Sequence, residues 1–135
     1  MKNGKFQITQ KLLLWDKNFF LYLKDKVTNL GDLPGGRIHQ KELYNLQESL
    51  IREVREELGN IEFEVQPEPV LVFPHYVSKD KEDSILILYN GNYWKGNITL
   101  SDEHSEYKWL HKKTPLENYF SDTLLIGLKK YFLKL

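Results

Sequence analysis

Three glutamates, Glu53, Glu56 and Glu57, are spaced i, i+3 and i+4 along the chain. On an α-helix with about 3.6 residues per turn, this spacing places their carboxylates in one stripe. Like charges at such spacings destabilise a helix unless a positive group lies nearby. A divalent cation meets this need, because hard cations prefer carboxylate oxygens as ligands. The spacing therefore suits a metal site, but a charge run alone favours a different interpretation. The alternative is a solvated charged face with ion pairs such as Glu48 with Arg52.

The carboxylate stripe requires a helix, and the surrounding residues predict one from about Leu46 to Leu58. Asn45 and Glu48 have the spacing of an N-cap and N3 pair, and Gly59 stands where a helix C-cap often lies. Apolar residues recur at helical spacing and form one face: Leu46, Leu50, Ile51, Val54 and Leu58. One side of this helix should therefore pack against a sheet.

Runs of β-compatible residues predict strands on both sides of this helix. Phe6–Trp15 and Phe19–Lys24 are separated by three polar residues, which predicts a hairpin. Further strands are expected in Ile61–Phe73, which prolines confine to an edge or split into shorter pieces, and in Ser84–Tyr89 and Tyr107–Leu110. Lys79–Asp83 is typical of an exposed loop. A terminal helix opens at Ser121 with one apolar face formed by Leu124, Leu125, Leu128, Phe132 and Leu135.

The order of these elements, strands, helix, strands and helix, predicts an α/β (α+β) fold in which helices flank a mixed sheet. A length of 135 residues with 41% apolar content suits a single domain over residues 1–135 with one buried core.

The composition narrows the classes of partner. Nineteen basic and nineteen acidic side chains cancel, so the chain lacks the positive charge that polymeric nucleic acid or an anionic membrane would require. No apolar run is long enough for a membrane span or a signal peptide, and we therefore expect a cytoplasmic protein. The chain has no cysteine, so a metal would bind to carboxylate, carbonyl or imidazole groups.

The segment around the glutamates resembles the Nudix box, G-x5-E-x7-R-E-U-x-E-E-x-G-U, in which U is a bulky aliphatic residue. Leu33–Gly36 is similar to the usual entry into the box, and Arg52–Gly59 reproduces its second half without a mismatch. The gap from Gly36 to Glu42 is kept, but nine residues instead of the usual seven separate Glu42 from Arg52. Asn60 takes the last aliphatic position, with Ile61 next. The chain is thus similar to the MutT-like Nudix hydrolases.

This resemblance implies a Nudix-like α/β/α sandwich that hydrolyses a diphosphate linkage in a nucleoside diphosphate derivative or a nucleoside triphosphate. It implies that Glu53, Glu56 and Glu57 bind Mg²⁺ or Mn²⁺, which would neutralise phosphate charge and orient a water molecule. Arg52 would orient these carboxylates through its planar guanidinium. The turn at Gly35 and Gly36 would bring the backbone close to the helix or to the ligand.

Two positions in the resemblance have alternatives. The family often supplies a general base from a loop after the box, and Glu103, six residues before Trp109, is the candidate, with Glu106 in reserve. Glu42 is the usual partner of the arginine, but the longer gap also allows Glu48, one turn before Arg52, to take that role.

Substrate recognition is less defined by the sequence. His75 and His104 can titrate near neutral pH, but single loop histidines are more often bystanders than metal ligands, and neither is assigned to catalysis. Tyr76, Tyr93 and Trp94 lie in expected loops where they could stack on a nucleobase, whereas Trp109 is expected in the core.

The resemblance implies a small nucleotide-type molecule as the partner. It leaves the oligomeric state open, and a homodimer is one possibility. The competing function is a non-catalytic Nudix-fold module that binds a nucleotide or regulates another protein.

Overall fold

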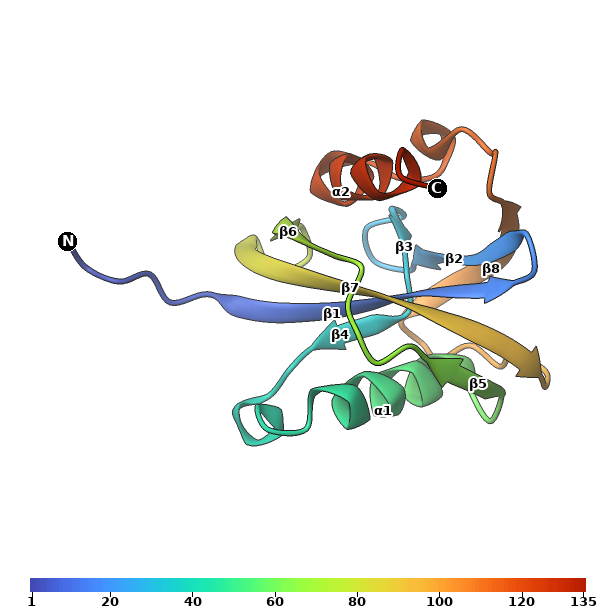
Figure 1. Ribbon diagram of the computed structural model, residues 1–135, viewed down its shortest axis with the longest axis horizontal. Coiled ribbons are helices and arrows are strands. Elements are labelled where there is room, and N and C mark those ends of the chain that lie inside the picture. The colour runs from blue at the N-terminus through green and yellow to red at the C-terminus, as the bar shows by residue number, and fades with distance from the viewer.

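The predicted α/β/α sandwich is confirmed. The computed structural model describes residues 1–135 and places a mixed eight-stranded sheet between helices α1 (Leu46–Leu58) and α2 (Asp122–Phe132), as Figure 1 shows. The strands are β1 (Gln7–Asp16), β2 (Phe19–Asp25), β3 (Gly31–Asp32), β4 (Gly35–Arg37), β5 (Glu62–Val65), β6 (Leu71–Val77), β7 (Glu82–Lys95) and β8 (His104–His111). Two short 3₁₀-helices, η1 (Gln40–Glu42) and η2 (Leu116–Asn118), precede α1 and α2.

The predicted hairpin forms only at its turn. β1 and β2 pair at Trp15 with Phe20 and at Asp16 with Phe19, and then diverge. β1 runs parallel to β7 over most of its length and pairs with β4, whereas β2 pairs with β3 and β8. Two short strands, β3 and β4, thus form where the sequence predicts only a glycine-rich turn, and they carry the chain from β2 to α1.

Helix α1 has the predicted bounds, and its apolar face is confirmed. Leu50, Val54 and Leu58 are fully buried and pack on a cluster that includes Leu12 and Leu14 of β1. The predicted N-cap pair does not form: the Asn45 side chain makes no cap hydrogen bond. Its backbone ψ of 55° departs from the extended conformation that directs an N-cap side chain at the first turn.

The second core cluster lies under α2. Leu13 of β1 points to this side, and Leu124, Leu128 and Tyr131 of α2 are buried against it. Leu135, predicted on this apolar face, lies beyond the end of α2 and is exposed. β1 is therefore covered on both faces, which explains its continuous apolar run.

Prolines divide the predicted strand after α1 into two, and the last two strands are longer than predicted. Pro67 and Pro69 separate β5 from β6, and Pro74 lies in β6, which pairs on one side only, with β7. β7 extends to Lys95, and β8 begins at His104, three residues earlier than predicted. No helix of the molecule is both long and apolar enough to cross a bilayer.

Candidate active site

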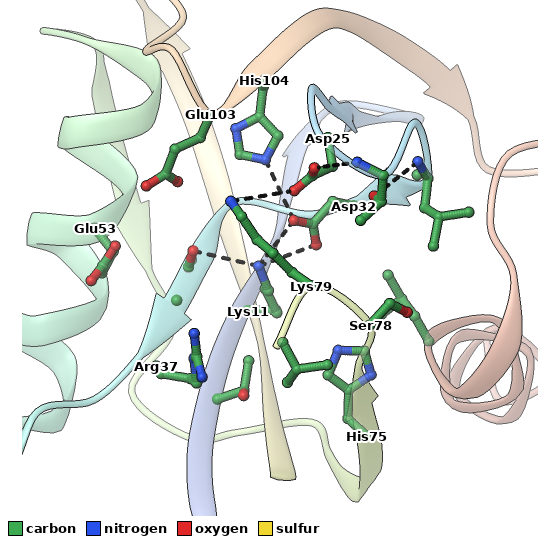
Figure 2. A pocket seen from close by; sticks show the side chains of 18 of the residues that line it. Lys11, Asp25, Asp32, Arg37, Glu53, His75, Ser78, Lys79, Glu103 and His104 are labelled. Atoms are coloured by element: carbon green, nitrogen blue, oxygen red, sulfur yellow. Dashed lines mark hydrogen bonds and ion pairs between the residues drawn. The ribbon is translucent and has the colours of Figure 1, made fainter. Parts of the chain in front are cut away.

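A cavity of about 600 Å³ opens between α1, the β3–β4 segment, the end of β6 and the start of α2. Glu53, Glu56, Glu57 and Arg52 of α1 line it together with Gly35, Gly36 and Glu103, so the residues predicted from the sequence share one space. Figure 2 shows Glu53 and Glu103 projecting into it from different elements.

Arg52 is the centre of an ion-pair network. Its Nη2 donates to Glu42 Oε2 at 2.7 Å and to Glu53 Oε1 at 3.2 Å, and its Nη1 donates to Glu56 Oε1 at 2.7 Å. Glu42, rather than Glu48, thus supports the arginine. The longer gap consists of a turn at residues 43–45 and the first six residues of α1, and the His39 backbone N–H holds Glu42 in place at 2.9 Å. That bond and the bond from Arg52 lower the pKa of Glu42.

Arg55, the other arginine of the box, faces away from the cavity. Its Nη1 donates to the carbonyl of Ile61 at 3.1 Å, and its guanidinium lies over the ring of Phe63. Arg52 is therefore the box arginine that compensates the glutamates.

The two glycines allow close approaches on either side of β4. A Cβ on Gly36 would lie 2.8 Å from Glu53 Oε2, so this residue must be glycine for Glu53 to stay where it is. Gly35 has a φ of 134°, and a Cβ there would lie 2.1 Å from the backbone oxygen of Gln10. The predicted close approach of this turn to the helix is therefore visible at Gly36, whereas the close approach at Gly35 is to β1.

Glu57 is the most buried of the three glutamates. Its side chain is 4% exposed, and its Oε1 accepts a hydrogen bond from the Gly35 backbone N–H at 2.8 Å. Burial raises its pKa to about 9, although Lys11 and the Gly35 bond act in the opposite direction. Burial also raises the pKa of Glu53. The site therefore holds carboxylates whose charge lacks full compensation.

The glutamates are not gathered into one tight cluster. Glu56 is 57% exposed and bonded to Arg52, and Glu57 is bonded to Gly35. The groups whose ligand atoms all lie within 4.8 Å of one another are Asp25–Asp32–His104 and Glu57–Glu103–His104. Of the predicted metal ligands, only Glu57 belongs to such a group.

Glu103 is fixed close to Glu57 by the backbone of the preceding loop. The N–H of Ser101 donates to the carbonyl of Glu57 at 3.2 Å, and the Glu103 carbonyl accepts from Lys26 N–H at 2.9 Å. Glu103 lines the cavity, whereas Glu106 lies further along β8 opposite Lys24 and does not. The geometry therefore favours Glu103 over Glu106 as the candidate general base.

A buried charged group lies beneath these glutamates and was missed by the sequence reasoning. Lys11 Nζ is 3.1 Å from Asp32 Oδ1 and donates to the carbonyls of Leu33 and Gly35. Burial alone lowers the pKa of Lys11, but Asp32 and Glu57 outweigh it and hold that pKa above its usual value. Burial raises the pKa of Asp32, but Lys11 and His104 hold it well below its usual range.

One sequence signal could have indicated this group. Lys11 directly precedes the aliphatic run of a strand that is covered on both faces, and lysine is almost never fully buried unless it is paired. A partner carboxylate was therefore required, but only the tertiary structure, in which Lys11 of β1 meets Asp32 of β3, shows which one it is.

The wall of the cavity opposite α1 is formed by β6 and the start of α2. His75 Nδ1 lies 2.9 Å from Thr123 Oγ1, and Tyr76 follows it in the strand. Tyr76, Tyr93 and Trp94 lie in strands, so the predicted loops are wrong at these positions, and neither Tyr93 nor Trp94 lines the cavity. The long β7 carries both away from it, and the Tyr93 ring packs at a tilt against Trp109 instead.

The tip of the β6–β7 hairpin reaches across the cavity. Arg37 of β4 pairs with Asp80, and Lys79 Nζ lies 4.0 Å from Asp25 Oδ2 (Figure 2). The segment predicted as an exposed charged loop is exposed throughout, although Glu82 and Asp83 already belong to β7, and Lys79 is its one residue that lines the cavity.

The model of the NUDIX domain family matches residues 6–122 of this chain. A search of curated protein sequences finds no significant match. Among solved structures, the MutT protein from Methanosarcina mazei is 25% identical, with a TM-score of 0.76 over 99% of this chain and 95% of that one.

Two more distant structures share the fold. A NUDIX-family hydrolase from Clostridium perfringens is 18% identical, with a TM-score of 0.77 over 97% of this chain and 99% of that one. A C. elegans Ap4A hydrolase is 16% identical, with a TM-score of 0.72 over 96% and 99%. Because the family model spans most of the chain, including the carboxylate helix and the strands beside it, this chain belongs to the NUDIX domain family and is a pyrophosphohydrolase.

Proposed function

We propose that this chain hydrolyses a diphosphate linkage in a nucleotide-type molecule with Mg²⁺ or Mn²⁺ held by Glu53, Glu56 and Glu57. The observation that supports it most is that these three glutamates share one cavity with Glu103. The cavity is lined by seven acidic residues and four lysines or arginines. A diphosphate would be repelled by this excess of negative charge unless cations accompany it.

The donor set fits a divalent metal ion. Carboxylate oxygens are suitable ligands for Mg²⁺ and Mn²⁺, and a bound cation would favour the ionised form of Glu57 that burial disfavours. When bound, such ions supply positive charge for the phosphate oxygens and orient the attacking water.

The chain's own residues supply the remaining chemistry. Glu103 accepts the proton of the attacking water as general base, from a loop that is hydrogen-bonded to Glu57. Arg52 orients Glu53 and Glu56 through separate guanidinium nitrogens, which a lysine could not do in the same geometry.

The opposite wall provides room for the nucleoside part of the substrate. Tyr76 is the one tyrosine in the lining of the cavity, which contains no phenylalanine or tryptophan, and its ring offers a surface on which a base could stack. The solved neighbour from C. elegans is an Ap4A hydrolase, so dinucleoside polyphosphates belong among the candidates with nucleoside triphosphates, nucleotide sugars and ADP-ribose.

A screen of these diphosphates with Mg²⁺ or Mn²⁺, with detection of released phosphate and nucleotide products, tests the proposal. We expect turnover with at least one class and its loss in EDTA. Glu57→Gln should lose most turnover and remain folded, whereas Glu68→Gln, an exposed carboxylate outside the cavity, should match the wild type. Full turnover by Glu57→Gln would refute the metal role of this residue.

A further inference from the structure

His104 has a buried nitrogen without a partner in the wall of the cavity. Its side chain is 2% exposed. Its Nε2 lies 3.4 Å from Asp32 Oδ2, whereas its Nδ1 is buried and has no hydrogen-bond partner. Buried polar atoms are nearly always bonded, so such an atom needs an explanation.

The surroundings of the ring decide which nitrogen carries the proton. Asp32 is paired with Lys11 at 3.1 Å, so it is an ionised carboxylate that can only accept a hydrogen bond. Nε2 must therefore donate to it. In the neutral ring, this leaves an unprotonated Nδ1 with its lone pair free. Figure 2 shows the ring between Asp32 on one side and Glu103 on the other.

The free nitrogen faces the glutamates. Nδ1 lies 4.0 Å from Glu57 Oε2, which is too long for a hydrogen bond. Two ligands that each lie about 2.1 Å from one metal ion can be up to about 4.2 Å apart. The separation of these two atoms is therefore within the span of one shared ion, and Glu103 lies in the same cluster.

An irregularity in the sheet gives His104 this direction. β8 pairs with β2 at Glu106 with Lys24 and then at His104 with Asp25, so β8 contains one extra residue between the two pairs. Such bulges redirect a side chain and are frequent beside active sites. Here the bulge places an imidazole next to the carboxylate helix.

We propose that His104 Nδ1 is a metal ligand that shares an ion with Glu57, and that Asp32 and Lys11 hold the ring in the binding tautomer. This inference rests on the proposed metal-dependent function and adds a nitrogen ligand from outside the box. A carboxylate that accepts the second N–H of a ligating histidine is a common arrangement in metal sites. The expectation that His104 is a bystander is replaced by this assignment.

A nitrogen ligand changes the choice of metal. Imidazole suits transition metals, whereas an all-oxygen site suits Mg²⁺. His104→Gln should therefore weaken binding of Co²⁺ more than binding of Mg²⁺. Mutation of residues that hydrogen-bond to metal ligands typically lowers metal affinity by about 10- to 100-fold. Because His104 would be a ligand itself, we expect its loss to weaken Co²⁺ affinity by at least about this factor.

The decisive measurement is electron spin echo spectroscopy of the full chain loaded with Mn²⁺, which detects a directly bound imidazole nitrogen. We expect a nitrogen coupling in the wild type and in His111→Gln, a residue of the same strand outside the cavity, and none in His104→Gln. His75→Gln, which removes a second cavity imidazole that lies beside Thr123 of α2, should also keep the coupling.

The outcomes separate this inference from the function on which it rests. If the wild type binds Mn²⁺ without a nitrogen coupling, or if the coupling persists in a folded His104→Gln, His104 is not a ligand, although the glutamate site stands. If the wild type binds no Mn²⁺ by calorimetry, the proposed metal-dependent function fails as well. The wild-type spectrum is informative even if a variant does not fold.

Discussion

Replacing Lys11 by methionine tests whether the buried pair beneath the site is required by the fold. Methionine fills a similar volume but cannot donate to Asp32 or to the carbonyls of Leu33 and Gly35, which Lys11 Nζ contacts. Asp32 would remain a largely buried carboxylate without its cation, since its side chain is 22% exposed. Removing one partner of a buried pair typically costs about 3–5 kcal/mol.

The structure places the expected loss at the lower end of this range. Asp32 keeps the hydrogen bond from the Leu33 N–H at 2.8 Å and the contact with His104, which offset part of the lost compensation. We therefore expect Lys11→Met to lower the free energy of unfolding by about 3 kcal/mol. The double variant Lys11→Met with Asp32→Asn removes both charges, and it should be more stable than Lys11→Met by about 1–2 kcal/mol.

The Lys11–Asp32 ion pair also predicts how the stability loss of Lys11→Met depends on pH. The folded-state pKa of Asp32 lies below its value in the unfolded chain, so its contribution to stability is complete above about pH 4 and is lost as the pH falls further. The deficit of Lys11→Met should thus be smaller at pH about 3 than at pH about 7.

Urea denaturation of the wild type, both single variants and the double variant gives the four free energies of unfolding. Together they form one double-mutant cycle. A Lys11→Met variant within about 1 kcal/mol of the wild type near neutral pH would refute this prediction, as would a double variant that loses the full sum of the single losses. Either result would mean that the two charges do not depend on each other.

Three further predictions concern the site itself. Glu103→Gln should lower kcat by about 100-fold or more while Mn²⁺ still binds, and an unchanged kcat would remove this residue as the base. Glu42→Gln should weaken turnover through loss of its bonds to the box arginine, whereas Glu48→Gln should match the wild type in the same assay; equal losses would contradict the assignment. Gly36→Ala should weaken Mn²⁺ binding in calorimetry, because its methyl group would push against the Glu53 carboxylate; unchanged affinity would show that Glu53 can move at no cost.

The sequence predicts the carboxylate helix well because its information is local. The bounds of α1 follow from apolar residues at helical spacing and from Gly59, and the stripe of glutamates follows from the turn of the helix. The segment that holds Glu103 is also found by its distance from Trp109 along the chain. These features need no knowledge of which strands pair.

The ion-pair partner of Arg52 could not be predicted from residue spacing alone. Both Glu42 and Glu48 are close enough in sequence, and helical spacing favours Glu48. The structure selects Glu42, because this residue ends η1 just before the turn into α1, where its carboxylate meets the guanidinium. An insertion of two residues thus leaves the ion pair intact.

The amino-acid sequence alone determined the helix, the glutamate stripe and the family, because each depends on residues that are adjacent in sequence or one helical turn apart. Only the tertiary structure brought Lys11, Asp32 and His104 together, since they come from three strands that are distant in sequence. The divergence of β1 from β2 and the bulge in β8 arise from strand pairing over long separations, which no local pattern encodes. The buried charges beneath the site are therefore a property of the fold.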